Sequence, residues 1–308
     1  MCGVCPVVYC GGLTENIVFT EYDEGAMKVN ILFIGDIVGR PGRHILSQEL
    51  NGLVKEHGID CVIANAENAA GGSGLTPQIY DKLLKYGVNL ITLGDHAYRK
   101  RDIITTLESV DDIVRPANLS CSAAGKELGL YKTSKGPTVG VIALIGRIFM
   151  KPADCPYSKI DSMLTRVRQE ADIVVVDMHA EATSEKVAMG YYLDGKVSCV
   201  VGTHTHVTTA DEKILPGGTA YITDVGMTGA HDSVLGRRTE SVLKSFRTQM
   251  PYPFEVATGD VRMSGVIMTV DSNSKQAERI ERIQVSEVCA EEISYDSDDG
   301  RPEYFNGF

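Results

Sequence analysis

The sequence predicts a protein of the α/β class, in which strands and helices alternate along one chain. Short runs rich in Val, Ile and Leu, long enough for buried strands, alternate with longer amphipathic segments of helical period. Several of the amphipathic segments are also bordered by residues that favour helix ends. Together these patterns are typical of strands that are packed against helices.

Three strands and two helices are expected in the first third of the chain. The first helix, over residues 43–57, follows a turn that contains Gly and Pro. We expect the second helix to be capped by Thr76, to have Pro77 in its first turn and to end at Gly87. The expected strands are residues 29–34, 61–64 and 88–93.

The same alternation continues to the end of the predicted domain. A helix near residues 159–170 is expected, and Thr183 is expected to cap a helix that runs to about residue 192. Since we find neither an internal repeat nor a long linker, we expect one domain over residues 27–290. The further expected strands are residues 138–145, 173–178, 197–201, 219–223, 262–270 and 280–285.

The two ends of the chain differ from this pattern. Residues 1–26 have no basic start and no cleavage-site pattern, so they fit a signal peptide poorly. They are interpreted as a flexible extension or as a mis-assigned start, with translation beginning at Met27. Residues 291–308 are acidic and contain Ser, Asp, Gly and Pro, which predicts a loose tail.

The composition excludes several classes of function. The formal net charge is −11 and no Lys/Arg-rich block occurs, which argues against binding to duplex nucleic acid. No apolar run approaches the roughly 20 residues that span a bilayer. A cytoplasmic protein is therefore expected, with a closed homo-oligomer as the default assembly. A small anionic substrate remains compatible with this charge, because bound metal ions reverse the local sign.

The cysteines indicate no dedicated cysteine chemistry. Cys61 and Cys199 lie in apolar runs and are expected to be buried free thiols. Cys2 and Cys5 form a Cys-x-x-Cys pair, but no second pair is nearby, so a zinc or redox site is not expected there. A chain of this length does not need a disulfide scaffold.

Metal-capable side chains occur directly after five of the expected strands. In open α/β sheets, ligands bind beyond the carboxyl ends of the strands, so these residues can be neighbours despite their separation in sequence. His44, His57 and His231 lie outside this pattern and are expected to be structural. The candidate residues are Asp36, Glu67, Asn68, Asp95, His96, His179, His204 and His206.

The ligand types indicate a transition-metal centre. If the backbone at His204 and His206 is extended, both imidazoles face one cavity, because residues i and i+2 point to the same side. Three histidines with up to three carboxylates suit iron, manganese or zinc better than calcium or magnesium. They are too many for one ion with an open position, so two ions sharing a carboxylate are expected, as in many phosphoester hydrolases.

Two glycine-rich stretches do not match nucleotide-binding fingerprints. Residues 35–42 lack the Gly-x-Gly-x-x-Gly spacing, and residues 70–74 lack the Lys-Ser/Thr of a P-loop. Both are interpreted as backbone that passes close to a bound ion or phosphate.

Six segments of the chain carry a resemblance to a known family. They are residues 34–39 (IGDIVG), 65–70 (NAENAA), 115–118 (RPAN), 177–186 (DMHAEATSEK), 201–207 (VGTHTHV) and 219–229 (TAYITDVGMTG). With these segments, the chain resembles the YmdB-like family of the calcineurin-type metallophosphoesterases over about residues 27–285. Neither terminal extension belongs to the resemblance.

The resemblance implies a four-layer α/β/β/α sandwich and the hydrolysis of phosphodiesters, notably 2′,3′-cyclic nucleotides such as 2′,3′-cyclic AMP. It also implies iron, sometimes with manganese, as the metal. By position, the first ion would be held by Asp36, His206 and Asn68, with Glu67 as the bridge to the second. Asp95, His179 and His204 would hold the second ion, and His96 would protonate the leaving oxygen.

One position departs from the family pattern, because Gly94-Asp95-His96 stands where the family has Gly-Asn-His. An Asn binds metal through its carbonyl and can also donate an N–H to a phosphate oxygen, whereas an ionised Asp only accepts. We therefore expect Asp95 to bind metal but to weaken substrate binding or to change the metal preference.

The expected reaction is attack of a metal-activated hydroxide on phosphorus, with His96 as the general acid. Arg40 or Arg115 is expected to help neutralise the phosphoryl oxygens. Two alternatives stay open from the residues alone. One is a metal-binding regulatory or scaffold protein with little turnover, and the other is a phosphomonoesterase that uses the same site.

Overall fold

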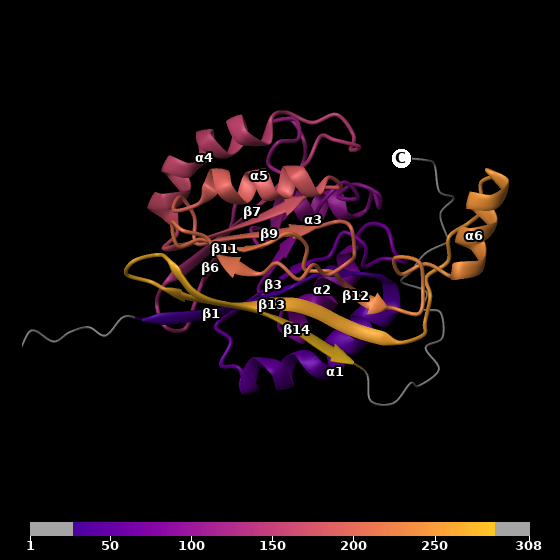
Figure 1. The fold of residues 1–308 in the computed structure, drawn as a ribbon, viewed down its shortest axis with the longest axis horizontal. Coiled ribbons are helices and arrows are strands. Elements are labelled where there is room, and N and C mark those ends of the chain that lie inside the picture. Colours follow the sequence, from indigo (N-terminus) through magenta and orange to yellow (C-terminus); the bar gives the residue numbers. More distant parts are fainter. Residues whose placement is uncertain (1–26, 287–308) are drawn as a thin grey trace, which may run out of the picture.

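The computed structural model describes residues 27–286 of the 308-residue chain. The predictions for residues 1–26 and 291–308 lie outside the described residues. Two β-sheets are stacked face to face, and helices cover the outer face of each sheet (Figure 1). The predicted α/β class and the four-layer α/β/β/α sandwich are therefore confirmed.

The first sheet contains eight strands. Its core is β1 (Lys28–Ile34), which pairs in parallel with β3 (Cys61–Asn65) and antiparallel with β13 (Val261–Asp271). The strand order is β2-β12-β13-β1-β3-β4-β5, and β14 pairs with β13. The other strands are β2 (Asp36–Ile37), β4 (Leu90–Thr92), β5 (Ile113–Val114), β12 (Met227–Ala230) and β14 (Ala277–Ser286).

The second sheet contains six strands in the order β10-β11-β9-β8-β7-β6. Its central strands β7, β8, β9 and β11 are parallel to one another, as β1, β3, β4 and β5 are in the first sheet. The bounds are β6 (Gly129–Lys132), β7 (Thr138–Ile145), β8 (Ile173–His179), β9 (Cys199–Thr203), β10 (Lys213–Ile214) and β11 (Ala220–Ile222).

Strand side chains alternate between two apolar layers. In β1, Ile31 and Phe33 pack between the two sheets, whereas Leu32 and Ile34 pack against the helices of the first sheet. A strand that is covered on both faces needs apolar residues at every position, which explains the unbroken apolar runs in the sequence. The helices that cover the first sheet are α1 (Gly39–Glu56), α2 (Pro77–Tyr86) and α3 (Ile103–Ser109). On the second sheet, α4 (Pro156–Glu170) and α5 (Thr183–Leu193) form the outer layer.

Most predicted helix ends agree with the structure, but α1 begins at Gly39 and so includes the Gly/Pro segment that was predicted to be a turn before residue 43. The Thr76 side chain accepts from Ile79 N at 3.3 Å, and Gly87 ends α2 in the left-handed region with φ 111°. The prediction that Thr183 caps α5 is wrong, because Ala182 precedes the helix and Thr183 is its first residue. The sequence analysis also missed α3 and α6 (Thr239–Thr248), which are short. Figure 1 shows that α6 projects from the sandwich, and Val242 is its buried residue.

Cys61 and Cys199 are buried free thiols, as predicted. Cys2 and Cys5, where no zinc or redox site is expected, lie outside the described residues. Among residues 27–286, no helix has the length and apolar character needed to cross a bilayer.

Candidate metal centre

The ends of five strands bring the eight predicted side chains together at one end of the sandwich. The first sheet supplies those that follow β1, β3 and β4, and the second sheet supplies those that follow or end β8 and β9. The backbone N–H of His204 donates to Asp36 Oδ2 at 3.2 Å, which joins the two sheets across the centre. Residues that are 168 positions apart in sequence are thus in direct contact. The residues brought together are Asp36, Glu67, Asn68, Asp95, His96, His179, His204 and His206.

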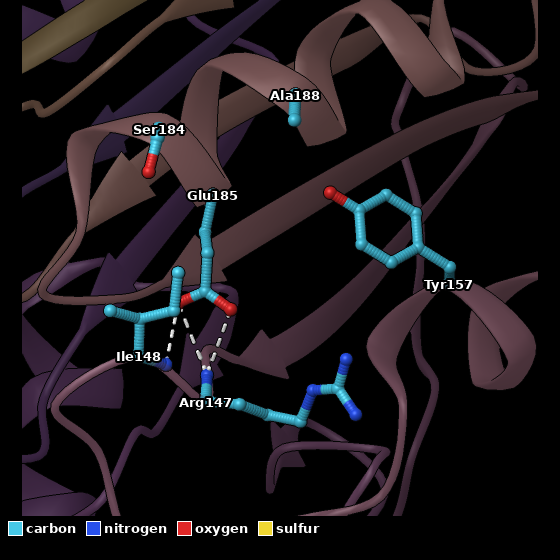
Figure 2. Close-up of a pocket in the computed structure, with 6 residues that line it drawn as sticks. All are labelled: Arg147, Ile148, Tyr157, Ser184, Glu185 and Ala188. Carbon is cyan, nitrogen blue, oxygen red and sulfur yellow. Dashed lines mark hydrogen bonds between the residues drawn. The ribbon is translucent and has the colours of Figure 1, made fainter.

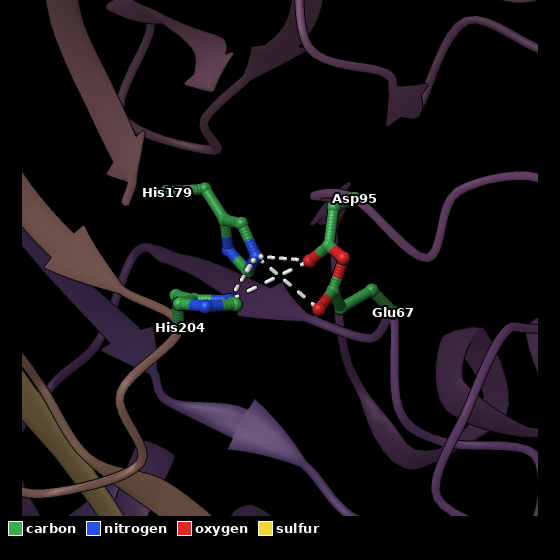
Figure 3. Close-up of side chains that lie close together, drawn as sticks. All are labelled: Glu67, Asp95, His179 and His204. Atoms are coloured by element: carbon green, nitrogen blue, oxygen red, sulfur yellow. Dashed lines mark hydrogen bonds and ion pairs between the residues drawn. The ribbon is translucent and has the colours of Figure 1, made fainter. Parts of the chain in front are cut away.

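Four of these residues form a compact ligand group (Figure 3). One donor atom from each of Glu67, Asp95, His179 and His204 lies within 4.8 Å of the others. His179 Nε2 lies 3.2 Å from Glu67 Oε1, 3.3 Å from Asp95 Oδ1 and 3.1 Å from His204 Nδ1. Two nitrogens and two carboxylate oxygens therefore face one point, which is the donor set of a transition metal.

A buried relay orients the His179 ring. Thr203 Oγ1 donates to Asp177 Oδ1 at 2.6 Å, so it accepts from His179 Nδ1 at 2.8 Å. Nδ1 thus carries a proton and Nε2 faces the ligand group, where it would offer its lone pair to a bound metal ion. A Cβ at Gly94 would overlap the His179 ring, so only glycine allows the Asp95 loop to approach this closely.

His204 is oriented by a residue that the sequence analysis did not assign. Glu181 Oε2 lies 3.2 Å from His204 Nε2, which leaves Nδ1 as the nitrogen that faces the ligand group. The predicted extended backbone at His204 and His206 is wrong. Strand β9 ends at Thr203, and the two histidines have φ angles of 93° and 63°. Their rings therefore diverge and serve different parts of the centre.

A second donor group adjoins the first. His206 Nδ1 donates to the carbonyl of Leu235 at 3.1 Å, so Nε2 has the lone pair, and it lies 3.7 Å from Asp36 Oδ1. Asn68 Nδ2 lies 3.2 Å from the same nitrogen. For Asn68 to bind a cation through Oδ1, its amide group would rotate by half a turn. This rotation exchanges Oδ1 and Nδ2 and leaves the shape of the side chain unchanged.

The charges of the centre favour a cation. Burial opposes the charged form of His179, but Glu67 and Asp95 outweigh it and hold the pKa of His179 well above its ordinary value. Burial also opposes ionisation of Asp95, yet hydrogen bonds from His179 and His204 hold its pKa well below the usual range. Asp36 Oδ1 is buried without a hydrogen-bond partner among the described residues. A buried carboxylate oxygen of this kind fits a metal ligand.

His96 lies at the edge of the centre, with its side chain 24% exposed. Its backbone N–H donates to Glu67 Oε2 at 2.9 Å, and its Nδ1 lies 2.7 Å from Asn68 Oδ1. Because that oxygen only accepts, Nδ1 carries a proton and Nε2 is the second proton-binding atom. Nε2 lies 3.7 Å from Asp95 Oδ2.

The structure does not bring Arg115 into this centre. Its guanidinium donates to the carbonyls of Ala123 and Pro116 and pairs with Glu127 at 3.1 Å, so we no longer assign it a phosphate-binding role. The sequence analysis also missed Asp177, Thr203 and Glu181, which orient ligands. They lie in or beside the motif segments, but no spacing rule distinguishes a residue that orients a ligand from its neighbours.

A pocket of about 490 Å³ lies along the first turns of α5, close in sequence to Glu181 (Figure 2). The carboxylate of Glu185 accepts from the backbone N–H groups of Arg147 and Ile148, each at about 3.0 Å. Gly146 N in turn donates to the carbonyl of His179 at 2.9 Å. The loop after β7 is therefore fixed between α5 and the end of β8 that carries His179.

The two-sheet sandwich, with a nitrogen and oxygen cluster at its strand ends, defines the architecture of the calcineurin-like metallophosphoesterases. Residues 32–283 match the family described as YmdB-like protein. The chain belongs to this family.

Relatives and solved structures agree with this assignment. The chain is 45% identical over 259 residues to a 2′,3′-cyclic-nucleotide 2′-phosphodiesterase of Bacillus subtilis, which covers 84% of the chain and 98% of that protein. A phosphatase structure from Mycoplasma pneumoniae has a TM-score of 0.80 at 34% identity, covering 85% of this chain and 95% of that one. A hypothetical protein from Thermus thermophilus has a TM-score of 0.79 at 39% identity, covering 84% and 100%.

Proposed function

We propose that this chain is a metal-dependent phosphodiesterase that hydrolyses small 2′,3′-cyclic nucleotides at a centre of two transition-metal ions. The observation that carries the proposal is the buried group of Glu67, Asp95, His179 and His204, with Asp36 and His206 beside it. The name of the Bacillus subtilis relative supports the substrate class. The donor set fits iron, manganese or zinc, and the resemblance to the YmdB-like family favours iron, with manganese as the second choice.

In this proposal, each ion would have its own ligands. Asp36, Asn68 and His206 would hold the first ion, and Asp95, His179 and His204 would hold the second. Glu67 would be the shared ligand, because its Oε1 faces His179 and also lies 3.4 Å from Asn68 Nδ2. When bound, two such ions acidify a water and neutralise charge on the phosphoryl oxygens.

His96 supplies the proton for the leaving oxygen. With the Asn68 amide turned over for metal binding, its Nδ2 would donate to His96 Nδ1, so Nε2 carries the proton that passes to substrate. The hydrogen bond from its backbone to Glu67 fixes the distance between this acid and the metal ligands. Protonation of a ribose oxygen is needed because an alkoxide is a poor leaving group.

Asp95 sets the charge next to the substrate. Since its pKa is held well below the usual range, it is ionised at neutral pH and offers no N–H to a phosphate oxygen. We propose that the negative charge of Asp95 increases metal affinity and lowers affinity for the anionic substrate.

The second candidate function is a phosphomonoesterase. Two Mycoplasma relatives are named putative phosphatase/phosphodiesterase, which supports this alternative. The cytoplasmic location and the homo-oligomer stay predictions.

Metal analysis and hydrolysis of 2′,3′-cyclic AMP by the same purified sample test the proposal. We expect about two transition-metal ions per chain and turnover that is abolished in His179→Ala. The matched control is His57→Ala, because His57 lies just after the end of α1 that is remote from the centre. Parallel assays on a simple phosphomonoester separate the two enzyme classes. Two metals without turnover on either substrate would instead favour a regulatory protein, and failure to bind iron or manganese would refute the proposal.

A further inference from the structure

A buried ion pair, which the proposed chemistry does not use, lies beside the turn that carries His204 and His206. Lys186 Nζ on α5 lies 2.6 Å from Asp224 Oδ2, and the two side chains are 1% and 0% exposed. Transfer of two charges out of water is costly, so a buried pair is by itself weak evidence for stability. The location of this ion pair beside the histidine turn therefore suggests a role other than stability.

Asp224 connects this pair to the histidine turn. Its Oδ2 also accepts from the backbone N–H of Thr205 at 3.2 Å and from the Thr205 hydroxyl at 2.7 Å. Its Oδ1 accepts from Gly226 N at 2.8 Å, and its carbonyl accepts from Thr209 N at 3.0 Å. Asp224 thus binds both ends of the segment 205–209.

Thr205 is the residue between the two strained histidines. Left-handed backbone is uncommon for residues other than glycine and persists where the surrounding structure enforces it. Here both donor groups of Thr205, its N–H and its hydroxyl, are bonded to Asp224. The strained turn directs His204 Nδ1 to within 3.1 Å of His179 Nε2, and His206 Nε2 to within 3.7 Å of Asp36 Oδ1.

The strand before the turn leaves room for the lysine. A Cβ at Gly202 would lie 2.8 Å from Lys186 Cδ, so the Lys186 side chain passes directly against β9. At this position its ammonium group pairs with Asp224 Oδ2, the same oxygen that accepts from Thr205.

We propose that Lys186 and Asp224 are positioning residues for the metal centre. Through Thr205, they hold His204 and His206 in left-handed conformations and direct one imidazole to each half of the centre. The inference rests on the proposed function, since it assigns a role toward the same metal ions. Lys186 and Asp224 themselves contact neither metal nor substrate.

The test measures Mn²⁺ affinity by calorimetric titration of chelator-treated full-length protein, with circular dichroism to confirm folding. Thr205→Val removes the hydroxyl donor and leaves the buried charges intact, whereas Thr205→Ser keeps the donor. We expect Mn²⁺ affinity to fall about 10- to 100-fold in Thr205→Val, the range for lost partners of metal ligands, and to be retained in Thr205→Ser. Lys186→Met and Asp224→Asn should show the same loss.

Arg115→Met is the matched control, because Arg115 is a buried cation paired with Glu127 away from the turn. We expect it to lower the unfolding temperature and to leave Mn²⁺ affinity per folded chain unchanged. Folded Thr205→Val with wild-type affinity would overturn the inference, even if the charge variants fail to fold. An equal loss of affinity in Arg115→Met would also overturn it. A wild-type protein that binds no Mn²⁺ or Fe²⁺ would refute the proposed function itself, and the inference with it.

Discussion

Glu181 Oε2 lies 3.2 Å from His204 Nε2, on the side of the imidazole that faces away from the ligand group. A carboxylate in this position fixes the tautomer and the orientation of a metal-binding histidine. Glu181 is 43% exposed and lies two residues after His179. Exposed glutamates are common on protein surfaces, so the contact with His204 is the observation that indicates a role for this one.

The first prediction concerns this contact. Glu181→Ala should lower metal affinity about 10- to 100-fold, because His204 loses its orientation, whereas Glu181→Gln should lose less since the amide oxygen still accepts. Metal titration of folded protein measures the effect. Glu56→Ala removes an exposed glutamate at the far end of α1 and is the control. Equal affinities in Glu181→Ala and Glu56→Ala would contradict the assignment.

The second prediction concerns His96. His96→Gln should lower kcat on 2′,3′-cyclic AMP by about 10² to 10⁴-fold, because the leaving ribose oxygen loses its proton donor. Metal content should be retained. A diester with a 4-nitrophenolate leaving group needs little protonation, so its hydrolysis should fall much less. If both substrates lose rate equally, His96 is not the general acid.

The third prediction concerns Asp95. Asp95→Asn adds an N–H donor and removes a negative charge, so turnover at low substrate concentration should rise by about tenfold, equivalent to one hydrogen bond to a charged group. Metal affinity should fall at the same time. Steady-state kinetics of metal-saturated protein test this. An unchanged or lower rate in a fully loaded variant would argue against the effect of Asp95 on substrate.

The fourth prediction concerns pH and the metal-free protein. Burial, reinforced by Glu67 and Asp224, raises the pKa of Asp36 from 3.8 to about 6. Because the folded state holds this proton more tightly than the unfolded state, the group contributes stability that is lost as pH rises through about 6. Metal-free protein should therefore unfold at a lower temperature at pH about 7.5 than at about 5.5. Asp36→Asn should reduce this difference, and an identical pH dependence in the variant would exclude Asp36 as its source.

The fifth prediction concerns Gly94. A Cβ at this position would overlap the His179 ring, so Gly94→Ala should displace the ring or the Asp95 loop and abolish tight metal binding. Gly52 in α1 has open space around it, so Gly52→Ala should raise stability by about 0.5–1 kcal/mol without changing metal content. Elemental analysis and thermal unfolding of the pair separate the two effects. Full metal content in Gly94→Ala would contradict this prediction, because it would show that the Asp95 loop can move away from His179 and still bind metal.

Much of the fold was predictable because its local signals agree. Runs buried on both faces predicted the central strands, and Thr76 and Gly87 predicted the ends of α2. Helix α3 was missed because seven residues carry a weak periodic signal, and α6, which is as long as α2, was missed because Arg238 and Gln249 at its ends are not typical capping residues. Thr183 was misassigned because a residue that favours caps also fits the first helical turn.

The order of residues predicts which side chains are available at the strand ends, since each directly follows an apolar run. Periodicity alone does not show that two sheets share the centre, because the pairing of β1 with β3 and of β8 with β9 depends on packing between distant segments. The orientation of the imidazoles could be seen in the folded chain alone. The left-handed turn at His204 and His206 and the contacts from Glu181, Thr203 and Asp224 set that geometry. Orientation of a ligand depends on what surrounds it in space, and neighbours in sequence do not specify those surroundings.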